Sequence, residues 1–143
     1  MSKETRKVLS AMLLGISVAV ILWITIFQRE GVTENPLSYH PFHTLYDFWK
    51  DITSSGIKGN FLGNILIFIP VGIFYPMTFG TRDYHAKKNT IRSVMFGFSL
   101  SLLIELTQLI FSKGYFEIDD MILNTIGSLI GYCIYCTCTR INK

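Results

Sequence analysis

Long apolar windows with few charged residues alternate with shorter polar segments along this chain. The windows cover residues 8–27, 61–79, 91–111 and 121–139. Each has close to the ~20 residues that an α-helix needs to cross a ~30 Å hydrocarbon layer at ~1.5 Å per residue. The pattern predicts an all-α membrane protein with four transmembrane helices, forming a single domain over residues 1–143.

The first window follows three basic residues, as the apolar part of a signal peptide does. Its apolar run is too long for that role, and the next stretch, "FQREGVTEN", offers no small-residue cleavage site. We therefore expect this window to stay in place as a membrane anchor. Half of the residues are apolar and 16% are charged, and the net charge of +3 comes without the basic domain that nucleic-acid binding would need.

Basic residues are unevenly divided between the two sides that four alternating crossings define. Nine lysines and arginines fall on the side that holds both termini, and four fall on the other side. Loops on the cytoplasmic side of a membrane carry the excess of basic residues. The distribution predicts that both termini lie in the cytoplasm.

A single carboxylate, Glu105, lies within the third window, in the stretch "SLLIELTQLIF". On insertion scales a charged side chain at the centre of a membrane costs about 2.5 to 3.5 kcal/mol. Asn64, Gln108 and Asn124 are amide donors that the predicted topology brings near this residue. Two interpretations stay open: a functional carboxylate, or a protonated or hydrogen-bonded one that only joins helices.

Polar and small residues form a stripe on each of the last two predicted helices. They recur every three or four residues, which places them on one helical face. A loop of only nine residues joins the two helices, and this favours an antiparallel hairpin with the stripes facing each other. Glycines four residues apart also permit close approach of helix backbones in lipid. The stripes are Ser101, Glu105, Gln108 and Ser112 on one helix, and Asp120, Asn124, Gly127 and Gly131 on the other.

The polar residues of three helices fall at one level of the membrane. At ~1.5 Å per residue, Asn64 and Asn124 lie roughly 5 Å below the outer edge of the hydrocarbon and Glu105 roughly 9 Å below it. We expect a polar pocket open to the outer leaflet, although Asp119 and Asp120 also stand where carboxylates cap a helix N-terminus. The candidate catalytic residues are Glu105, Asp119 and Asp120, and the candidate substrate-binding residues are Asn64, Gln108, Asn124 and Glu117.

Three weaker patterns complete the picture. Residues 41–52, "PFHTLYDFWKDI", form an aromatic-rich amphipathic segment that predicts an interfacial anchor or a lid over the polar site. His40 and His43 lack the ligand spacing of a metal site, so we expect no metal and no cofactor. The cysteines, Cys133, Cys136 and Cys138, are expected to be unpaired thiols at the cytoplasmic end of the last helix.

Several motifs in a fixed order resemble the VanZ-like family of bacterial membrane proteins. The resemblance implies a small helical protein of the bacterial plasma membrane, and the family's namesake is associated with resistance to the glycopeptide teicoplanin. The family often has an arginine before its acidic run, and Lys113 stands nearest to that position as a candidate contact for an anionic headgroup. The motifs are "PF" at residues 41–42, N-x-x-x-F-x-P-x-G at 64–72, E-x-x-Q at 105–108 and F-E-I-D-D-x-x-x-N-x-x-G-x-x-x-G at 116–131.

Three functional hypotheses follow from these residues and this resemblance. In the first, the pocket binds or modifies a membrane lipid or a lipid-linked cell-wall intermediate, and so lowers susceptibility to teicoplanin-type glycopeptides. In the second, Glu105 is the carrier site of a proton- or cation-coupled transporter. Four short helices would have to form a homo-oligomer to make a pathway, and the inner halves of the spans lack the ionisable residues of a relay. In the third, the chain is a scaffold without enzymatic activity that binds another membrane protein through the aromatic segment 41–52 and the glycine-rich last helix, with Gly127 and Gly131. The sequence leaves open whether the protein is an enzyme.

Overall fold

The computed structural model describes residues 2–27, 59–80, 87–113 and 116–141. Within these ranges four helices are long and apolar enough to cross a membrane, which confirms the predicted all-α membrane architecture. The helices are α1 (Lys3–Leu22), which continues as the short π-helix η1 (Trp23–Phe27), α3 (Gly59–Phe79), α4 (Lys87–Ile110) and α5 (Ile118–Ile141).

The helices extend beyond the apolar windows, mainly at their polar ends. α1 begins at Lys3, where the Ser2 hydroxyl caps it by accepting a hydrogen bond from the backbone N–H of Thr5 at 3.0 Å. α5 begins at Ile118, so Asp119 and Asp120 form part of its first turn. Hydropathy marks where a helix lies in lipid, whereas the helix itself continues for as long as its backbone hydrogen bonds are made.

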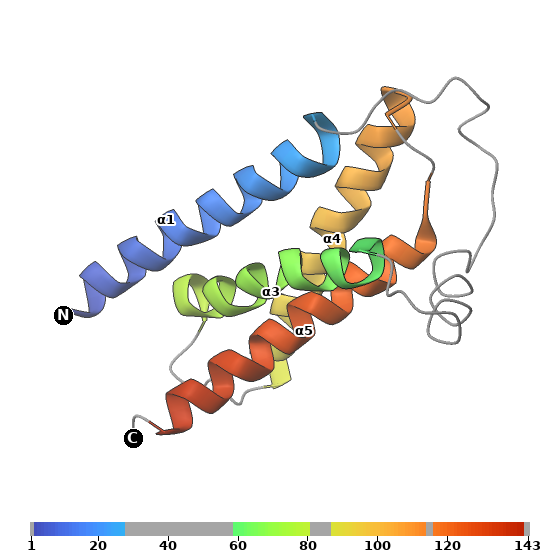
Figure 1. Cartoon of the computed structure of the whole chain (residues 1–143). Coiled ribbons are helices and arrows are strands. Elements are labelled where there is room, and N and C mark those ends of the chain that lie inside the picture. Colours follow the sequence, from blue (N-terminus) through green and yellow to red (C-terminus); the bar gives the residue numbers. More distant parts are fainter. Residues whose placement is uncertain (1, 28–58, 81–86, 114–115, 142–143) are drawn as a thin grey trace.

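α1 and α5 both extend along the length of the molecule, and the two termini lie at the same end of it (Figure 1). α3 packs against both α1 and α5. α4 crosses behind α3 and packs against α5. We call the end that holds the termini the terminal end and the opposite end, where α4 turns back into α5, the turn end.

The contact between α3 and α5 is close enough to exclude any side chain from part of it. A Cβ atom placed on Gly131 or on Gly127 of α5 would overlap the carbonyl oxygen of Ile69 or of Ile65 on α3, and Gly72 of α3 meets the backbone of α5 in the same way. The sequence predicted close backbone packing at these two glycines of α5, and the structure confirms it. The expected partner was wrong, because the glycines face α3 and not α4.

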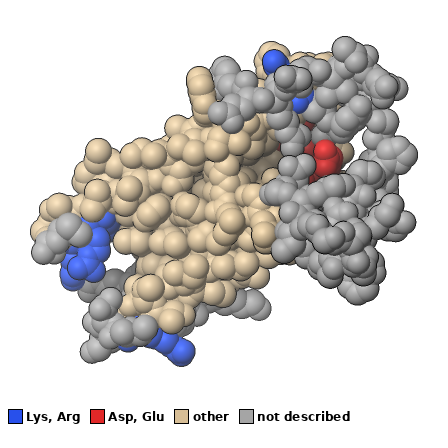
Figure 2. All heavy atoms as spheres, viewed as in Figure 1, with Lys and Arg blue, Asp and Glu red and all other residues tan. Residues whose placement is uncertain are grey.

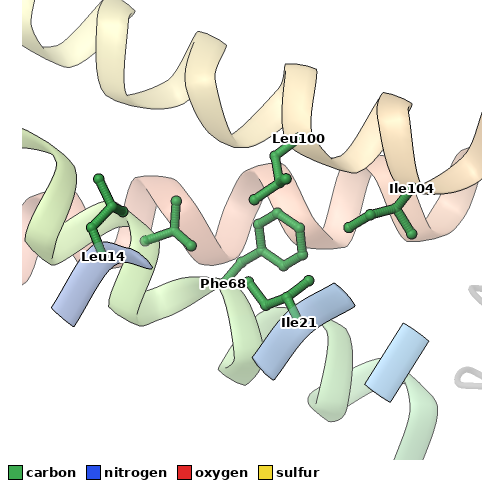
Figure 3. Packing of buried hydrophobic residues seen from close by; sticks show 6 residues of the cluster. Leu14, Ile21, Phe68, Leu100 and Ile104 are labelled. Atoms are coloured by element: carbon green, nitrogen blue, oxygen red, sulfur yellow. The ribbon is translucent and has the colours of Figure 1, made fainter. Parts of the chain in front are cut away.

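Apolar side chains from α1, α3 and α4 fill the centre of the bundle. Phe68 of α3 is fully buried and lies among Leu100 and Ile104 of α4 and Ile21 of α1, with Leu14 farther along α1 (Figure 3). These side chains interdigitate from three different helices, so the core depends on their packing together rather than on any helix alone.

The outer surface has the charge distribution of a membrane protein. Large apolar side chains such as Leu103 and Ile110 are exposed on the helices, as lipid-facing side chains are. In Figure 2 a broad uncharged belt covers the middle of the molecule, basic side chains appear at the terminal end, and both acidic and basic side chains appear at the turn end.

Candidate functional site

The candidate site is a set of buried polar side chains at the turn end, supplied by α4 and α5. Glu105 and Gln108 of α4 are each 1% exposed, and Asp119, Asp120 and Asn124 of α5 are between 2% and 4% exposed. Ionisable and amide groups reach such burial in proteins only when hydrogen bonds or charges compensate the lost water. We call these five residues, together with Asn64, the polar cluster.

Asp120 connects α5 to α3. Its Oδ1 atom accepts a hydrogen bond from Asn64 Nδ2 at 2.5 Å, and Asn64 itself is half-buried. Because Asp120 stands in the first turn of α5, its carboxylate also faces the positive end of the helix dipole. The amide donor and the start of α5 therefore both hold this carboxylate in place.

Glu105 connects α4 to the start of α5. Its Oε2 atom accepts a hydrogen bond from the backbone N–H of Glu117, the residue before α5, at 2.9 Å. The carboxylate thus satisfies one of the N–H groups that a helix N-terminus leaves without an intrahelical partner. This geometry agrees with both interpretations of Glu105, because a carboxylate that joins two helices is also held in a fixed position for chemistry.

Gln108 brings a fourth element into the cluster. Its Nε2 atom donates a hydrogen bond to the backbone carbonyl of Thr25 at 2.8 Å, and Thr25 lies in the π-helix η1 at the end of α1. A π-helical segment changes the direction of the backbone groups within a helix, and such segments are frequent at functional sites. No pattern of side chains in the sequence indicates Thr25, because its backbone carbonyl is the acceptor.

Asn124 and Ser101 join α5 and α4 one turn farther into the bundle. Asn124 Nδ2 donates to Ser101 Oγ at 2.8 Å, so the two polar stripes face each other here as predicted. The stripe on α4 ends earlier than expected, because Ser112 lies beyond the helix, exposed, with a positive φ of 51°. A residue in this left-handed conformation commonly ends a helix.

Lys113 and Glu117 lie at the edge of the cluster. Lys113 is half-buried in the turn after α4, and its backbone N–H donates to the carbonyl oxygen of Gln108 at 2.9 Å. Glu117 is half-buried before α5. The candidate residues of the sequence analysis are thus all at the turn end, with six of them in the polar cluster and these two beside it.

Comparison with known proteins assigns the chain to a family. The model of the family described as VanZ/LLP1 matches residues 8–139. The chain belongs to the VanZ/LLP1 family. It is 30% identical over 129 residues to "Protein VanZ" of Enterococcus faecium, an alignment that covers 90% of this chain and 74% of that protein. No solved structure matches the chain.

Family membership and the four membrane-spanning helices together make this VanZ/LLP1 chain a multi-pass membrane protein. The match confirms the resemblance that the ordered motifs indicated. It also covers every residue of the polar cluster, since all six lie between residues 8 and 139.

Some predictions for this VanZ/LLP1 chain fall on other parts of it. The amphipathic segment 41–52, His40 and His43 lie outside the described residues. In the part that the structure describes, no group of three histidine, cysteine, aspartate or glutamate residues is arranged to hold a metal ion. Cys133, Cys136 and Cys138, which are all the cysteines of the chain, form no disulfide with one another.

The hydrogen bond from Gln108 to η1 gives a first testable prediction. Replacing Gln108 with methionine keeps the size of the side chain but leaves the carbonyl of Thr25 without this donor. We expect the unfolding free energy in detergent to fall by about 1 to 3 kcal/mol. Thr107→Val is the matched control, because the Thr107 hydroxyl donates only to Leu103 of its own helix at 2.7 Å. Equal unfolding midpoints for the two variants would contradict a stabilising role for the contact with η1.

Proposed function

We propose that this VanZ/LLP1 protein binds or modifies an envelope lipid or a lipid-linked cell-wall intermediate at its turn end, and that this activity lowers susceptibility to teicoplanin-type glycopeptides. The proposed location is the bacterial plasma membrane. The terminal end, on whose side nine of the thirteen lysines and arginines fall, would face the cytoplasm, and the turn end would face outward.

The observation that carries this proposal is the convergence of the polar cluster. Asn64 from α3, Glu105 and Gln108 from α4, and Asp120 and Asn124 from α5 lie at the turn end, with Asn124 one turn farther into the bundle, although a membrane-spanning bundle gains little from polar groups there. Gathering them in one place concentrates acceptors and donors where a polar headgroup would lie beside lipid chains.

Each polar group of the cluster suits a particular role in this proposal. Glu105 would act as the acid, base or acceptor for the bound headgroup, with Asp120 and Asp119 as further carboxylates beside it. Asn64 and Asn124 would orient the substrate. Lys113, half-buried at the edge, would contribute a positive charge for an anionic phosphate.

For this function a ligand must be able to reach the polar cluster. Glu105, Gln108 and Asp119 are at most 2% exposed, so the cluster is closed in the structure and not open as the sequence analysis expected. The proposal therefore includes an opening of the turn end, in which the hydrogen bonds of Glu105 and Gln108 to neighbouring backbone groups exchange for bonds to the ligand.

The scaffold hypothesis has less support at the glycines of α5, while its aromatic loop lies outside the described residues. Gly127 and Gly131 contact the backbone of α3 inside the same chain, and a partner helix would have to displace α3 to reach them. The lipid or lipid-linked ligand remains the better supported candidate.

Glycopeptide susceptibility of a sensitive bacterial host tests this function. We expect wild type to raise the minimal inhibitory concentration of teicoplanin several-fold, and Glu105→Gln and Asp120→Asn to abolish the increase at equal membrane abundance. A glutamine at position 105 still accepts the hydrogen bond from Glu117, so its loss of function would report the carboxylate itself. Glu4→Gln, at an exposed carboxylate of α1, is the control and should protect as wild type does.

Two outcomes would contradict the proposal. Protection that survives both carboxylate substitutions would make the cluster a purely structural joint between helices. Absence of protection by abundant, correctly folded wild type would separate this chain from the glycopeptide phenotype.

A further inference from the structure

A line of buried polar side chains continues from the polar cluster along the whole of α4. Asn89, Ser93, Ser101 and Glu105 are each at most 3% exposed. They follow one another at intervals of four or eight residues, so the line winds around the helix by roughly 40° for every four residues. From Asn89 to Gln108 the line measures roughly 28 Å at ~1.5 Å per residue, which is close to the full thickness of the hydrocarbon layer.

The gap in this line on α4 is filled from α5. Gly97 stands where the next polar residue would be, and a Cβ atom there would overlap Ser128 Oγ. The hydroxyl of Ser128 therefore occupies the place between Ser93 and Ser101. Asn124 and Ser128 are themselves four residues apart on α5, so both helices supply oxygen atoms to one shared seam.

Three oxygen atoms in this seam have no hydrogen-bond partner in the protein. They are Ser93 Oγ, Ser128 Oγ and Asn124 Oδ1, on residues that are 0%, 0% and 4% exposed. A buried polar atom left without a partner costs about 1 to 3 kcal/mol, and buried water molecules commonly supply the missing bonds. Three such atoms in one seam point to bound water.

The spacing of these atoms suits single water molecules. Residues four apart on a helix are displaced by ~6 Å along its axis, and one water molecule with two hydrogen bonds of ~2.8 Å spans nearly that distance. A water molecule that bridged Asn124 Oδ1 and Ser128 Oγ would satisfy both atoms, and Ser93 Oγ needs a partner of its own.

We propose that the seam between α4 and α5 holds a file of water molecules that conducts protons between the terminal end and Glu105. A proton enters the first water at the terminal end, and each water molecule or serine hydroxyl accepts one proton while it releases another to the next. Asn124 Oδ1, which has no proton to release, only accepts a hydrogen bond from the file. The last proton is taken by the carboxylate of Glu105 or leaves at the turn end, and no electrons are transferred. The seam thus binds water and carries the hydrated proton.

The proposal does not require ionisable residues in the inner half of the membrane. Hydroxyl groups and water relay protons through their hydrogen bonds, so the absence of carboxylates between Asn89 and Glu105 does not interrupt the path. The titratable groups at its turn end are Glu105, Glu117, Asp119 and Asp120, and Tyr132 stands beside its terminal end on α5. The path is independent of the glycopeptide phenotype.

Proton uptake into sealed vesicles tests this inference. The full chain is reconstituted in sodium-free liposomes that contain a pH-sensitive dye, and valinomycin with a potassium gradient supplies the driving potential. We expect wild type to take up protons several-fold faster than protein-free vesicles. Ser93→Ala combined with Ser128→Ala, which removes two oxygen atoms from the seam, should lower the protein-dependent rate at least three-fold.

A hydroxyl outside the seam provides the control. Ser17 of α1 donates to the carbonyl of Leu13 at 2.8 Å, so Ser17→Ala is the same chemical change and should leave the rate unchanged. Each variant is compared at equal reconstituted amount and equal helical circular dichroism, and the single Ser93→Ala variant repeats the measurement if the double variant does not fold. Wild-type uptake equal to that of empty vesicles, or full uptake by well-folded seam variants, would overturn the proposal.

Discussion

Replacing Gly131 with alanine is expected to lower the unfolding free energy of the protein by about 1 to 3 kcal/mol, the usual cost of overpacking a closely fitted interior. The added Cβ atom would overlap the carbonyl oxygen of Ile69 and lie 2.9 Å from the Cα atom of Gly72. Both are backbone atoms, so no side-chain rotation relieves the overlap and α3 and α5 must separate. Reversible unfolding in mixed detergent micelles, followed by circular dichroism, measures the change.

Gly15 provides the matched control for this substitution. It lies in the middle of α1, and a Cβ atom there would meet nothing within 4 Å. Gly15→Ala should therefore leave stability unchanged or raise it by up to ~1 kcal/mol, because alanine is the better helix former. If Gly131→Ala behaved like Gly15→Ala, the close contact of α3 and α5 would not be part of the folded protein in the membrane.

Asn64 and Asp120 are expected to be energetically coupled by about 1 to 3 kcal/mol in a double-mutant cycle. Asn64→Leu removes an amide donor from a carboxylate that is 4% exposed, so the single substitution should destabilise strongly. In the Asp120→Leu background the same change removes no such bond and should cost much less. Unfolding free energies of the four proteins, measured under one set of detergent conditions, give the coupling.

A distant pair checks that the coupling is specific. Thr139 lies near the other end of α5, where its hydroxyl donates to the carbonyl of Tyr135 at 2.9 Å. Thr139→Val and Asn64→Leu should therefore be additive within about 0.5 kcal/mol. A coupling between Asn64 and Asp120 no larger than that of the distant pair would show that their contact does not hold α3 to α5.

The polar cluster was largely predictable because burial in lipid makes polar residues conspicuous. Glu105, Gln108 and Asn124 stand out within apolar windows, and four alternating crossings bring Asn64 to the same level. What the pattern did not indicate is which group bonds to which. Asp120 pairs with Asn64 of α3, and Glu105 bonds to the backbone at the start of α5.

Small and hydroxyl residues were harder to assign from sequence. Ser93 and Ser128 are common residues in transmembrane helices, and nothing in their spacing alone separates a lipid-facing serine from a buried one. Their burial depends on which face of α4 meets α5, and that face is decided by helix rotation. The seam between the two helices therefore emerged only from the structure.

The sequence by itself determined the four membrane-spanning helices, the end at which the polar groups gather and the family, because length, hydropathy and ordered motifs are local properties of the chain. The tertiary structure alone decided how the helices are rotated and paired. It placed Gly127 and Gly131 against α3, Gln108 against the carbonyl of Thr25, and Ser128 over Gly97. These contacts join residues far apart in the chain, and the fit of side chains and backbones across helices selects them.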